Sequence, residues 1–506
     1  MSAAEADERL RPPFLRSVEF IAFSSGLVGI AIRLREYVFN RSLWVDEALL
    51  ALNVTGRGLQ ITSVREQAAP IGFLTVIELA TRAFGASEPV LRLLPLVAGI
   101  ATIAVAYKLA VAYYDKQTAV AFVFLLSLSS LLIYYSTEFK QYGVDGFVGV
   151  CLLSQFHRFT AVDRRADYRW LGAVGALAIL FSHPASLMLA SVGVVLAAAA
   201  AHRRQWDRLA RLAGCGALWL LIFAFVYRVN AGSAVSSSVM QAFHLPSFAP
   251  LAVSAATLRW YVNAIESFFM YALDPRLWLL CLVLFAVGTY SLSRRARPIV
   301  WLMASNVILL GIVSAMHLYP IHQRFLIYLY PLASLLIAVG AAPAIRSPAA
   351  ATIVLFLVML HPVLADRLRE LMRPVGREET RELIDILLRQ REPNDGLLVW
   401  GATTPAYLYY REVINNRPED KDYTTIDGDL YQALSVADVN RAVAASGRSR
   451  FWVLASHMDA GGFGARNLRT LREALGSVAN VEREWLRRDG FLWYYNLRPD
   501  DLRSGH

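Results

Sequence analysis

Long apolar runs separated by short polar segments fill most of the chain up to about residue 366. A transmembrane helix needs about 20 predominantly apolar residues, so each run is a candidate span. About eleven are expected, near 15–36, 89–112, 117–135, 143–160, 168–182, 184–201, 208–229, 273–293, 298–316, 324–344 and 348–365. Only 18% of the 506 residues are charged, against about 25% in soluble proteins. The sequence therefore predicts a polytopic α-helical membrane protein.

The positive charges gather in every second loop between the predicted spans. Arginine and lysine are enriched in the cytoplasmic loops of membrane proteins. Here they occupy 108–116, 158–169, 203–211, 294–297 and 346. This pattern predicts a cytoplasmic N-terminus and an extracytoplasmic C-terminal region. The formal net charge of +10 comes largely from these loops and reflects membrane orientation. No nucleic-acid partner is therefore expected.

Residues 70–85 are the exception among the apolar segments. They are too few to span and carry Glu78 and Arg82 within a helical pattern. An amphipathic helix in the outer membrane interface is expected there. The alternative, a short distorted span, would invert every later loop and place the arginine-rich segments outside.

From about residue 367 the composition changes to amphipathic and short apolar segments in alternation. Helices are expected from Glu378 to the turn at Pro393 and near 402–411, 435–446 and 464–475, with strands at 397–400, 450–455, 481–487 and 491–497. Such alternation is typical of an α/β domain. We therefore expect a transmembrane module over 1–366 and a soluble extracytoplasmic α/β domain over 367–506.

Two adjacent acids, Asp46 and Glu47, follow the first apolar run in the first outer loop. A carboxylate at membrane depth is unfavourable unless it is solvated, paired or used, so the pair is a candidate catalytic site. The alternative is that both acids only mark the end of a hydrated loop.

A second candidate lies between the third and fourth predicted spans. Tyr135, Glu138, Tyr142 and Asp145 are spaced three, four and three residues apart, which places them along one helical face. Carboxylates accept hydrogen bonds from sugar hydroxyls, and tyrosine rings pack on apolar sugar faces. The face is thus suited to a polyhydroxylated ligand, while an interfacial aromatic belt is the alternative.

A third candidate is the segment around Tyr319, His322 and Arg324. Arg324 begins an apolar run, and its fork of donors matches the oxygens of a phosphate group. Arg33, near the outer end of the first predicted span, allows the same interpretation. For both arginines the alternative is snorkelling to lipid headgroups.

Metal binding stays open on the sequence alone. The outward carboxylates and His183, His317 and His322 are possible ligands of a divalent metal ion. None of them shows the His-x-x-x-His or Glu-x-x-His spacing of recognised metal motifs.

Several of these segments occur together in a fixed order over residues 30–345. They are Leu43-Trp-Val-Asp-Glu-Ala48, Gln67-Ala-Ala-Pro70, Leu91-Arg-Leu-Leu-Pro95, Tyr134–Asp145, Phe181–Pro184, and Tyr319-Pro320 with Arg324-Phe325. The ordered set resembles the glycosyltransferase C superfamily, specifically bacterial enzymes similar to the lipid A aminoarabinose transferase and the protein O-mannosyltransferases. The chain differs in one place: those enzymes have lysine or histidine just before the proline of the first loop, where Ala69 precedes Pro70.

The resemblance implies an inverting transferase of the bacterial inner membrane. It would move a sugar from a polyprenyl-phosphate donor to a lipid, glycan or protein acceptor at the outer face. Asp46 would be the general base and Glu47 would position donor or acceptor. The expected substrate-binding residues are Glu138, Tyr142, Asp145, Arg324, His322, Tyr319 and Arg33. No cofactor is implied with certainty, and a divalent metal is possible.

Two other functions are compatible with the composition. A transporter or flippase of lipid-linked saccharides is the first, although transporters usually contain two repeated halves and no internal repeat is evident. A non-catalytic envelope scaffold that presents the α/β domain is the second. The activity of an Asp46→Asn variant separates the scaffold from the enzyme.

Overall fold

The computed structural model describes residues 14–55, 69–161, 165–295, 297–346, 363, 365–372, 378–416, 423–426, 434–458 and 464–497. The chain forms two compact units. The first comprises Met1–Val38, Ile61–Val76 and Arg92–Pro374, and the second comprises Phe39–Gln60, Ile77–Leu91 and Val375–His506. The unit that contains the C-terminal domain therefore also contains the segment with Asp46 and Glu47.

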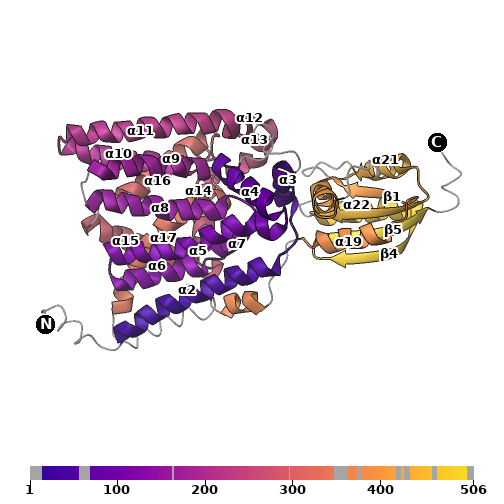
Figure 1. Cartoon of the computed structure of the whole chain (residues 1–506), viewed down its shortest axis with the longest axis horizontal. Coiled ribbons are helices and arrows are strands. Elements are labelled where there is room, and N and C mark those ends of the chain that lie inside the picture. The colour runs from indigo at the N-terminus through magenta and orange to yellow at the C-terminus, as the bar shows by residue number, and fades with distance from the viewer. Residues whose placement is uncertain are drawn as a thin grey trace. The chain divides into compact units, whose positions relative to one another are not determined.

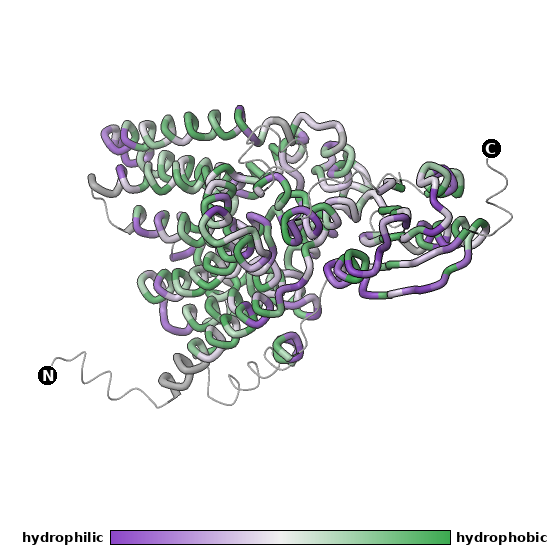
Figure 2. The backbone as a smooth tube through the Cα atoms, turned by 45° about the vertical axis from the view of Figure 1, so that its right-hand side comes forward, coloured by the Kyte–Doolittle hydropathy of each residue, from purple (hydrophilic) through white to green (hydrophobic). Residues whose placement is uncertain are grey.

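The first unit is a bundle of apolar helices (Figure 1). Its long helices are α2 (Phe14–Phe39), α5 (Glu88–Tyr113), α6 (Lys116–Leu128), α8 (Tyr142–Ala161), α9 (Arg165–Phe181), α10 (Ala185–His202), α11 (Trp206–Val226), α15 (Trp278–Arg295), α16 (Arg297–Ala315) and α17 (Tyr330–Arg346). In Figure 2 these helices are hydrophobic along most of their length, and hydrophilic residues gather in the turns between them.

The prediction of a multi-pass membrane protein is confirmed. In the described part of the chain, six helical segments are long and apolar enough to cross a bilayer: Glu88–Tyr113, Ala185–His202, Trp206–Ala231, Pro275–Arg295, Arg297–Ala315 and Gln323–Ile345. The other predicted runs up to residue 344 are also helical. The eleventh, 348–365, lies almost wholly outside the described residues. The number of spans therefore stays a prediction.

Close helix packing in the first unit depends on paired glycines. Gly288 on α15 and Gly340 on α17 face each other's helices, and a Cβ on either would overlap a backbone carbonyl, that of Leu336 or Leu284. Small residues let helix backbones approach closely where no hydrophobic effect drives them together. This crossing fixes α17, which also packs against α6 and α8, at the centre of the unit.

One segment of the first unit differs from the sequence prediction. The predicted loop 230–272 contains α12 (Gly232–Ser236), α13 (Ser238–His244) and the longer α14 (Ala255–Met270). Helix α14 begins where the Ser254 side chain accepts a hydrogen bond from the backbone N–H of Thr257, and such a cap satisfies an otherwise unpaired helical donor. The segment 70–85 forms α4 (Ile71–Phe84), as predicted, but its depth in the interface stays a prediction.

The stretch 135–145 is not the single helix that its spacing predicts. α7 (Ser130–Tyr135) ends at Tyr135 and α8 begins at Tyr142, with turns between them. Ser136 and Thr137 donate their hydroxyls to the carbonyls of Ile133 and Tyr134, at 2.6 and 3.2 Å. Side chains that bond their own backbone in this way compete with helix continuation.

The C-terminal part of the second unit is an α/β domain, as predicted. Its strands are β1 (Gly396–Trp400), β2 (Thr424–Ile426), β3 (Arg450–Ser456), β4 (Ala479–Arg487) and β5 (Gly490–Leu497). They form one sheet in the order β2-β1-β3-β5-β4. β1 pairs in parallel with β2 and β3, whereas β5 pairs antiparallel with β3 and β4. The three-residue strand β2 was not predicted, because it is too short to show alternation.

Alternate residues of the central strands face opposite sides of this sheet. Leu398, Phe451 and Val453 belong to a buried core with residues of α21 (Val436–Ser446) and α22 (Gly464–Val478). Helix α19 (Thr380–Gln390) packs against β3 and β5. Between β1 and β2, the chain is helical where a helix at 402–411 is predicted. This stretch consists of a 3₁₀ turn (Gly401–Thr403), the short α20 (Thr404–Leu408) and a π-helical turn (Tyr409–Ile414).

Candidate functional site

In the first unit, the second and third candidate segments of the sequence lie together. The ring of Tyr142 lies 4.9 Å from that of Tyr135 and 5.9 Å from that of Phe325. The guanidinium carbon of Arg324 lies 5.1 Å from the Phe325 ring centroid. Residues that are about 180 positions apart in the sequence thus form one aromatic cluster with a cation at its edge.

Both acids of the second segment belong to the same neighbourhood. Glu138 and Asp145 are buried, with 1% and 2% of their surface exposed. The charges of Glu138 and Arg324 both act on the Tyr135 hydroxyl. Burying a carboxylate is unfavourable unless it is paired or hydrogen-bonded, so their presence here indicates a polar site within an otherwise apolar bundle.

Tyr319 contributes a hydroxyl from the loop before α17. Burial raises the pKa of Tyr319 well above its usual range, and the nearby Asp145 carboxylate raises it further. The hydroxyl therefore stays protonated, and it donates to the backbone carbonyl of Phe325 at 2.8 Å. This bond fixes the turn that carries Arg324.

The local fold explains why this turn can approach α8. Residues Gln323–Leu329 form a 3₁₀ helix that leads into α17 and packs against α8. A Cβ on Gly149 of α8 would overlap the backbone carbonyl of Tyr328. On the other side of the turn, Gln323 donates from its side-chain amide to Ser267 Oγ of α14 at 2.9 Å.

A small pocket of about 60 Å³ lies beside this turn. It is lined by Ala264, Ser267, Phe268, Ile321, His322, Gln323 and Leu326. His322 itself is exposed, and its ring lies 6.1 Å from that of Phe325. The structure thus brings together six predicted substrate-binding residues, namely Glu138, Tyr142, Asp145, Tyr319, His322 and Arg324. Their binding role stays a prediction.

The seventh, Arg33 of α2, contacts the C-terminal end of α6 and is 1% exposed. Its Nη1 donates to the carbonyls of Gly29 and Ser127 at 2.9 and 2.8 Å, and its Nη2 donates to that of Leu126 at 3.0 Å. The last carbonyls of a helix lack intrahelical partners and carry a partial negative charge. Arg33 therefore satisfies the C-terminal end of α6.

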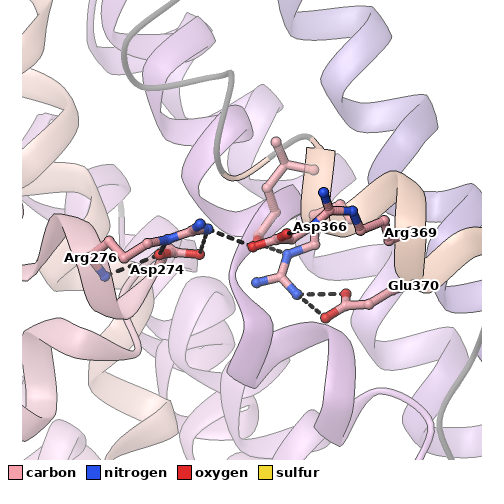
Figure 3. Close-up of polar contacts among 7 residues, drawn as sticks. Asp274, Arg276, Asp366, Arg369 and Glu370 are labelled. Atoms are coloured by element: carbon pink, nitrogen blue, oxygen red, sulfur yellow. Dashed lines mark hydrogen bonds and ion pairs between the residues drawn. The ribbon is translucent and has the colours of Figure 1, made fainter.

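A second buried arginine completes this helix end. Arg367, in the helix 365–372, donates from Nε to the Leu128 carbonyl at 3.1 Å and pairs with Glu370. Figure 3 shows the neighbouring ion pairs. Arg276 donates to both oxygens of Asp274, at 2.7 and 2.9 Å, and to Asp366 at 2.6 Å. These contacts join the start of α15 to the helix 365–372.

In the second unit, Asp46 and Glu47 occupy the first turn of a helix, α3 (Val45–Thr55), and not the loop that the sequence predicts. Acidic side chains are favourable at a helix N-terminus, where the backbone N–H groups carry partial positive charge. Glu47 is fully buried, whereas Asp46 is only partly buried.

The residues before α3 pack against the α/β domain. The backbone N–H of Leu43 donates to the hydroxyl of Tyr410 at 2.8 Å. Arg381 of α19 pairs with Glu88 at 2.6 Å and donates to the Asn40 carbonyl at 2.8 Å. The C-terminal domain thus positions the helix that carries the predicted base. Sequence reasoning did not find Arg381 or Tyr410, because neither lies in a motif.

Sequence reasoning also missed a cluster beside Trp44. The ring of His457 lies 5.8 Å from that of Trp44, and its Nδ1 lies 2.7 Å from Glu378 Oε1. Burial lowers the pKa of His457, but the hydrogen bond and charge of Glu378, with the charges of Asp489 and Asp46, outweigh burial and raise it overall. Sequence spacing carries no signal for this cluster, since only the folded sheet brings its members together.

A family model matches one part of the chain. Residues 68–227 match the family described as dolichyl-phosphate-mannose-protein mannosyltransferase. No curated protein sequence matches the chain significantly.

Solved structures match over nearly the whole chain. ArnT from Cupriavidus metallidurans bound to undecaprenyl phosphate is 14% identical with a TM-score of 0.55, and the match covers 94% of this chain and 97% of ArnT. The apo state of ArnT gives 16% identity, a TM-score of 0.51 and coverage of 97% and 98%. The archaeal oligosaccharyltransferase AglB from Archaeoglobus fulgidus, in complex with an inhibitory peptide and a dolichol-phosphate, is 12% identical with a TM-score of 0.50. The match covers 96% of this chain and 75% of AglB. These comparisons identify the chain as a multi-pass membrane protein with the fold of the glycosyltransferase C superfamily.

Proposed function

We propose that this protein is an inverting glycosyltransferase that moves a sugar from a polyprenyl-phosphate donor to a lipid, glycan or protein acceptor. The observation that carries the proposal is the meeting of Arg324 with two buried acids and three tyrosines in the first unit. Cation, carboxylates and aromatic rings are the groups that recognise a phosphate and a sugar. The undecaprenyl phosphate bound by the similarly folded ArnT supports the choice of donor.

Arg324 is the proposed contact of the donor phosphate. In the reaction, the bond between the anomeric carbon and the phosphate oxygen breaks, and negative charge grows on the departing polyprenyl phosphate. A guanidinium stabilises this charge through charge-assisted hydrogen bonds in its planar fork. The ring centroids of Tyr142 and Phe325 lie 5.9 and 5.1 Å from the guanidinium carbon, within the range of a cation–π attraction that favours this position of the cation.

Asp46 is the proposed general base. It would take the proton of the acceptor hydroxyl while that oxygen attacks the anomeric carbon from the face opposite the phosphate, which inverts the configuration. A phosphate leaving group needs no protonation by a second carboxylic acid, unlike the leaving alcohol in glycoside hydrolysis. Glu47, buried beside Asp46 in the first turn of α3, is proposed to position donor or acceptor.

The proposal places the reaction at the outer face of the bacterial inner membrane. Its support is the arginine-rich set of alternate loops, which favours a cytoplasmic N-terminus and an extracytoplasmic C-terminal domain.

The test is a transfer assay with the purified full-length protein in lipid nanodiscs. A panel of polyprenyl-phosphate hexoses and pentoses is supplied with an envelope lipid and glycan extract, and the released polyprenyl phosphate is measured by mass spectrometry. We expect acceptor-dependent release from at least one donor and almost none with Asp46→Asn. Movement of an intact donor across vesicles without release would instead support the flippase. Release that is equal in wild type and Asp46→Asn would exclude the assigned base.

A further inference from the structure

Three potential metal ligands meet at one edge of the α/β domain, each from a different element. Glu378 lies two residues before the start of α19, His457 directly follows β3, and Asp489 lies in the turn between β4 and β5. One ligand atom from each lies within 4.8 Å of the other two. The sheet pairing of β3 with β5 and the backbone bond from Glu379 N to Arg488 O, at 3.1 Å, hold the three elements in this arrangement.

A second observation points to a ligand at this place. Glu378 is 1% exposed, and while its Oε1 lies 2.7 Å from His457 Nδ1, its Oε2 has no hydrogen-bond partner among the described residues. Buried carboxylate oxygens are nearly always hydrogen-bonded or bound to a metal, because an unsatisfied one is strongly unfavourable. An ion pair with His457 accounts for one oxygen of Glu378 and leaves the other unexplained.

We propose that Glu378, His457 and Asp489 bind one divalent cation of the Zn²⁺ class. One imidazole nitrogen and two carboxylate oxygens are three typical Zn²⁺ ligands, and a water molecule would complete a four-coordinate site. The imidazole disfavours Mg²⁺ and Ca²⁺, which prefer oxygen ligands.

The spacing of the three groups fits this cation after a small adjustment. Zn²⁺ bonds to nitrogen and oxygen are about 2.0–2.2 Å long, which separates the ligand atoms of a tetrahedral site by about 3.3–3.6 Å. The cation would replace the proton that His457 and Glu378 share, and the two groups would move apart by less than about 1 Å.

The site would act as a clip within the second unit. It would join the start of α19, the end of β3 and the β4–β5 turn next to Trp44, whose ring contacts His457. Trp44 directly precedes α3, so the cation would also restrict the movement of the residues that lead into that helix. A cation that binds the folded but not the unfolded chain raises stability by mass action. This role is independent of the proposed transfer reaction.

The experiment measures metal binding by the full-length protein, purified in detergent through a tag without histidine and stripped with a chelator. Zn²⁺ is titrated in, bound metal is counted by mass spectrometry after dialysis, and the unfolding temperature is recorded. Co²⁺ serves as a visible-absorption probe of the ligand sphere. We expect one tight Zn²⁺ per chain, a higher unfolding temperature with Zn²⁺, and much weaker binding of Mg²⁺ and Ca²⁺.

Variants then assign the ligands. Loss of even an outer-shell partner weakens metal binding by about 10–100-fold, so His457→Ala, Glu378→Gln and Asp489→Asn should each weaken Zn²⁺ binding by roughly 100-fold or more. The controls His202→Ala and Glu473→Gln remove an exposed imidazole and an exposed carboxylate from helix surfaces and should bind as wild type. Asparagine has nearly the same size and shape as aspartate, so Asp489→Asn should leave the β4–β5 turn intact. This variant therefore tests the site even where the His457 variant fails to fold.

Two results would overturn the proposal. One is wild-type protein that binds no more Zn²⁺ than the Glu378→Gln, His457→Ala double variant. The other is Zn²⁺ binding that Asp489→Asn and Glu378→Gln leave unchanged, since the metal would then sit elsewhere.

Discussion

The guanidinium carbon of Arg324 lies 5.9 Å from the ring centroid of Tyr142, although Tyr142 begins α8 and Arg324 precedes α17. A cation over an aromatic face is attracted by the ring quadrupole. A planar guanidinium also stacks on the ring, which a compact ammonium group does not do. The contact therefore favours one position of the Arg324 guanidinium beside the Tyr142 ring.

Arg324→Ala should weaken polyprenyl-phosphate binding at least tenfold, because a hydrogen bond to a charged group contributes about 1.5–3 kcal/mol. Arg324→Lys should restore only part of the affinity, since the charge survives without the fork. Tryptophan fluorescence or microscale thermophoresis with short-chain polyprenyl phosphate measures both variants.

Arg294→Ala is the matched control for Arg324. Arg294 also lies over a tyrosine ring at a helix end, with its guanidinium carbon 4.7 Å from the Tyr290 centroid, and it is exposed. Its loss should leave donor affinity unchanged. If Arg324 only snorkels to lipid headgroups, Arg324→Lys will bind as wild type and Arg324→Ala will lose almost nothing.

Asp46→Asn should lower turnover by roughly 10²–10⁴-fold, because a positioned general base contributes a factor of that size. Donor affinity and unfolding temperature should hardly change, since the amide keeps the size of the side chain in the first turn of α3. Asp207→Asn, which alters an exposed acid in the first turn of α11, is the control. Turnover of the purified Asp46 variant at the wild-type rate would refute the assignment.

Arg33→Gln should mainly destabilise the protein. The variant loses the three bonds from Arg33 to the carbonyls of Gly29, Leu126 and Ser127. Leu126 and Ser127 lie in the last turn of α6, where a buried carbonyl left without a partner costs about 1–3 kcal/mol. A clear drop in unfolding temperature is expected in detergent, with little change in donor affinity per folded molecule. Arg35→Gln, two residues later on α2, is the control. Normal stability with weakened donor binding would instead favour the substrate role that the sequence suggests.

Reporter fusions test the membrane orientation. A fusion after residue 165 should report the cytoplasm, and one after residue 500 should report the exterior, as the arginine-rich loops predict. The two reporters act as controls for each other, since each is active on one side only. A cytoplasmic signal at residue 500 would contradict an extracytoplasmic α/β domain and, with it, the proposed place of reaction.

The prediction of the site was least accurate where polar side chains altered the backbone. The spacing of Tyr135, Glu138, Tyr142 and Asp145 predicts one helical face, yet Ser136 and Thr137 bond their own backbone and end the helix. The residues still gather, but they do so because the chain turns back through 136–141. The helical spacing of residues does not reveal this competition, because the competition depends on which side-chain hydroxyl bonds to which backbone carbonyl.

The sequence by itself determined the membrane character, the helical runs and the α/β alternation, because hydropathy and periodicity are local properties of the chain. It also pointed to Asp46 and Arg324, since charge at membrane depth is conspicuous in any sequence. Only the tertiary structure joined 134–145 to 317–325, assigned Arg33 to the end of α6, and brought Glu378, His457 and Asp489 together. These contacts link residues up to nearly 200 positions apart, and they depend on close backbone approach and strand pairing that no local pattern encodes.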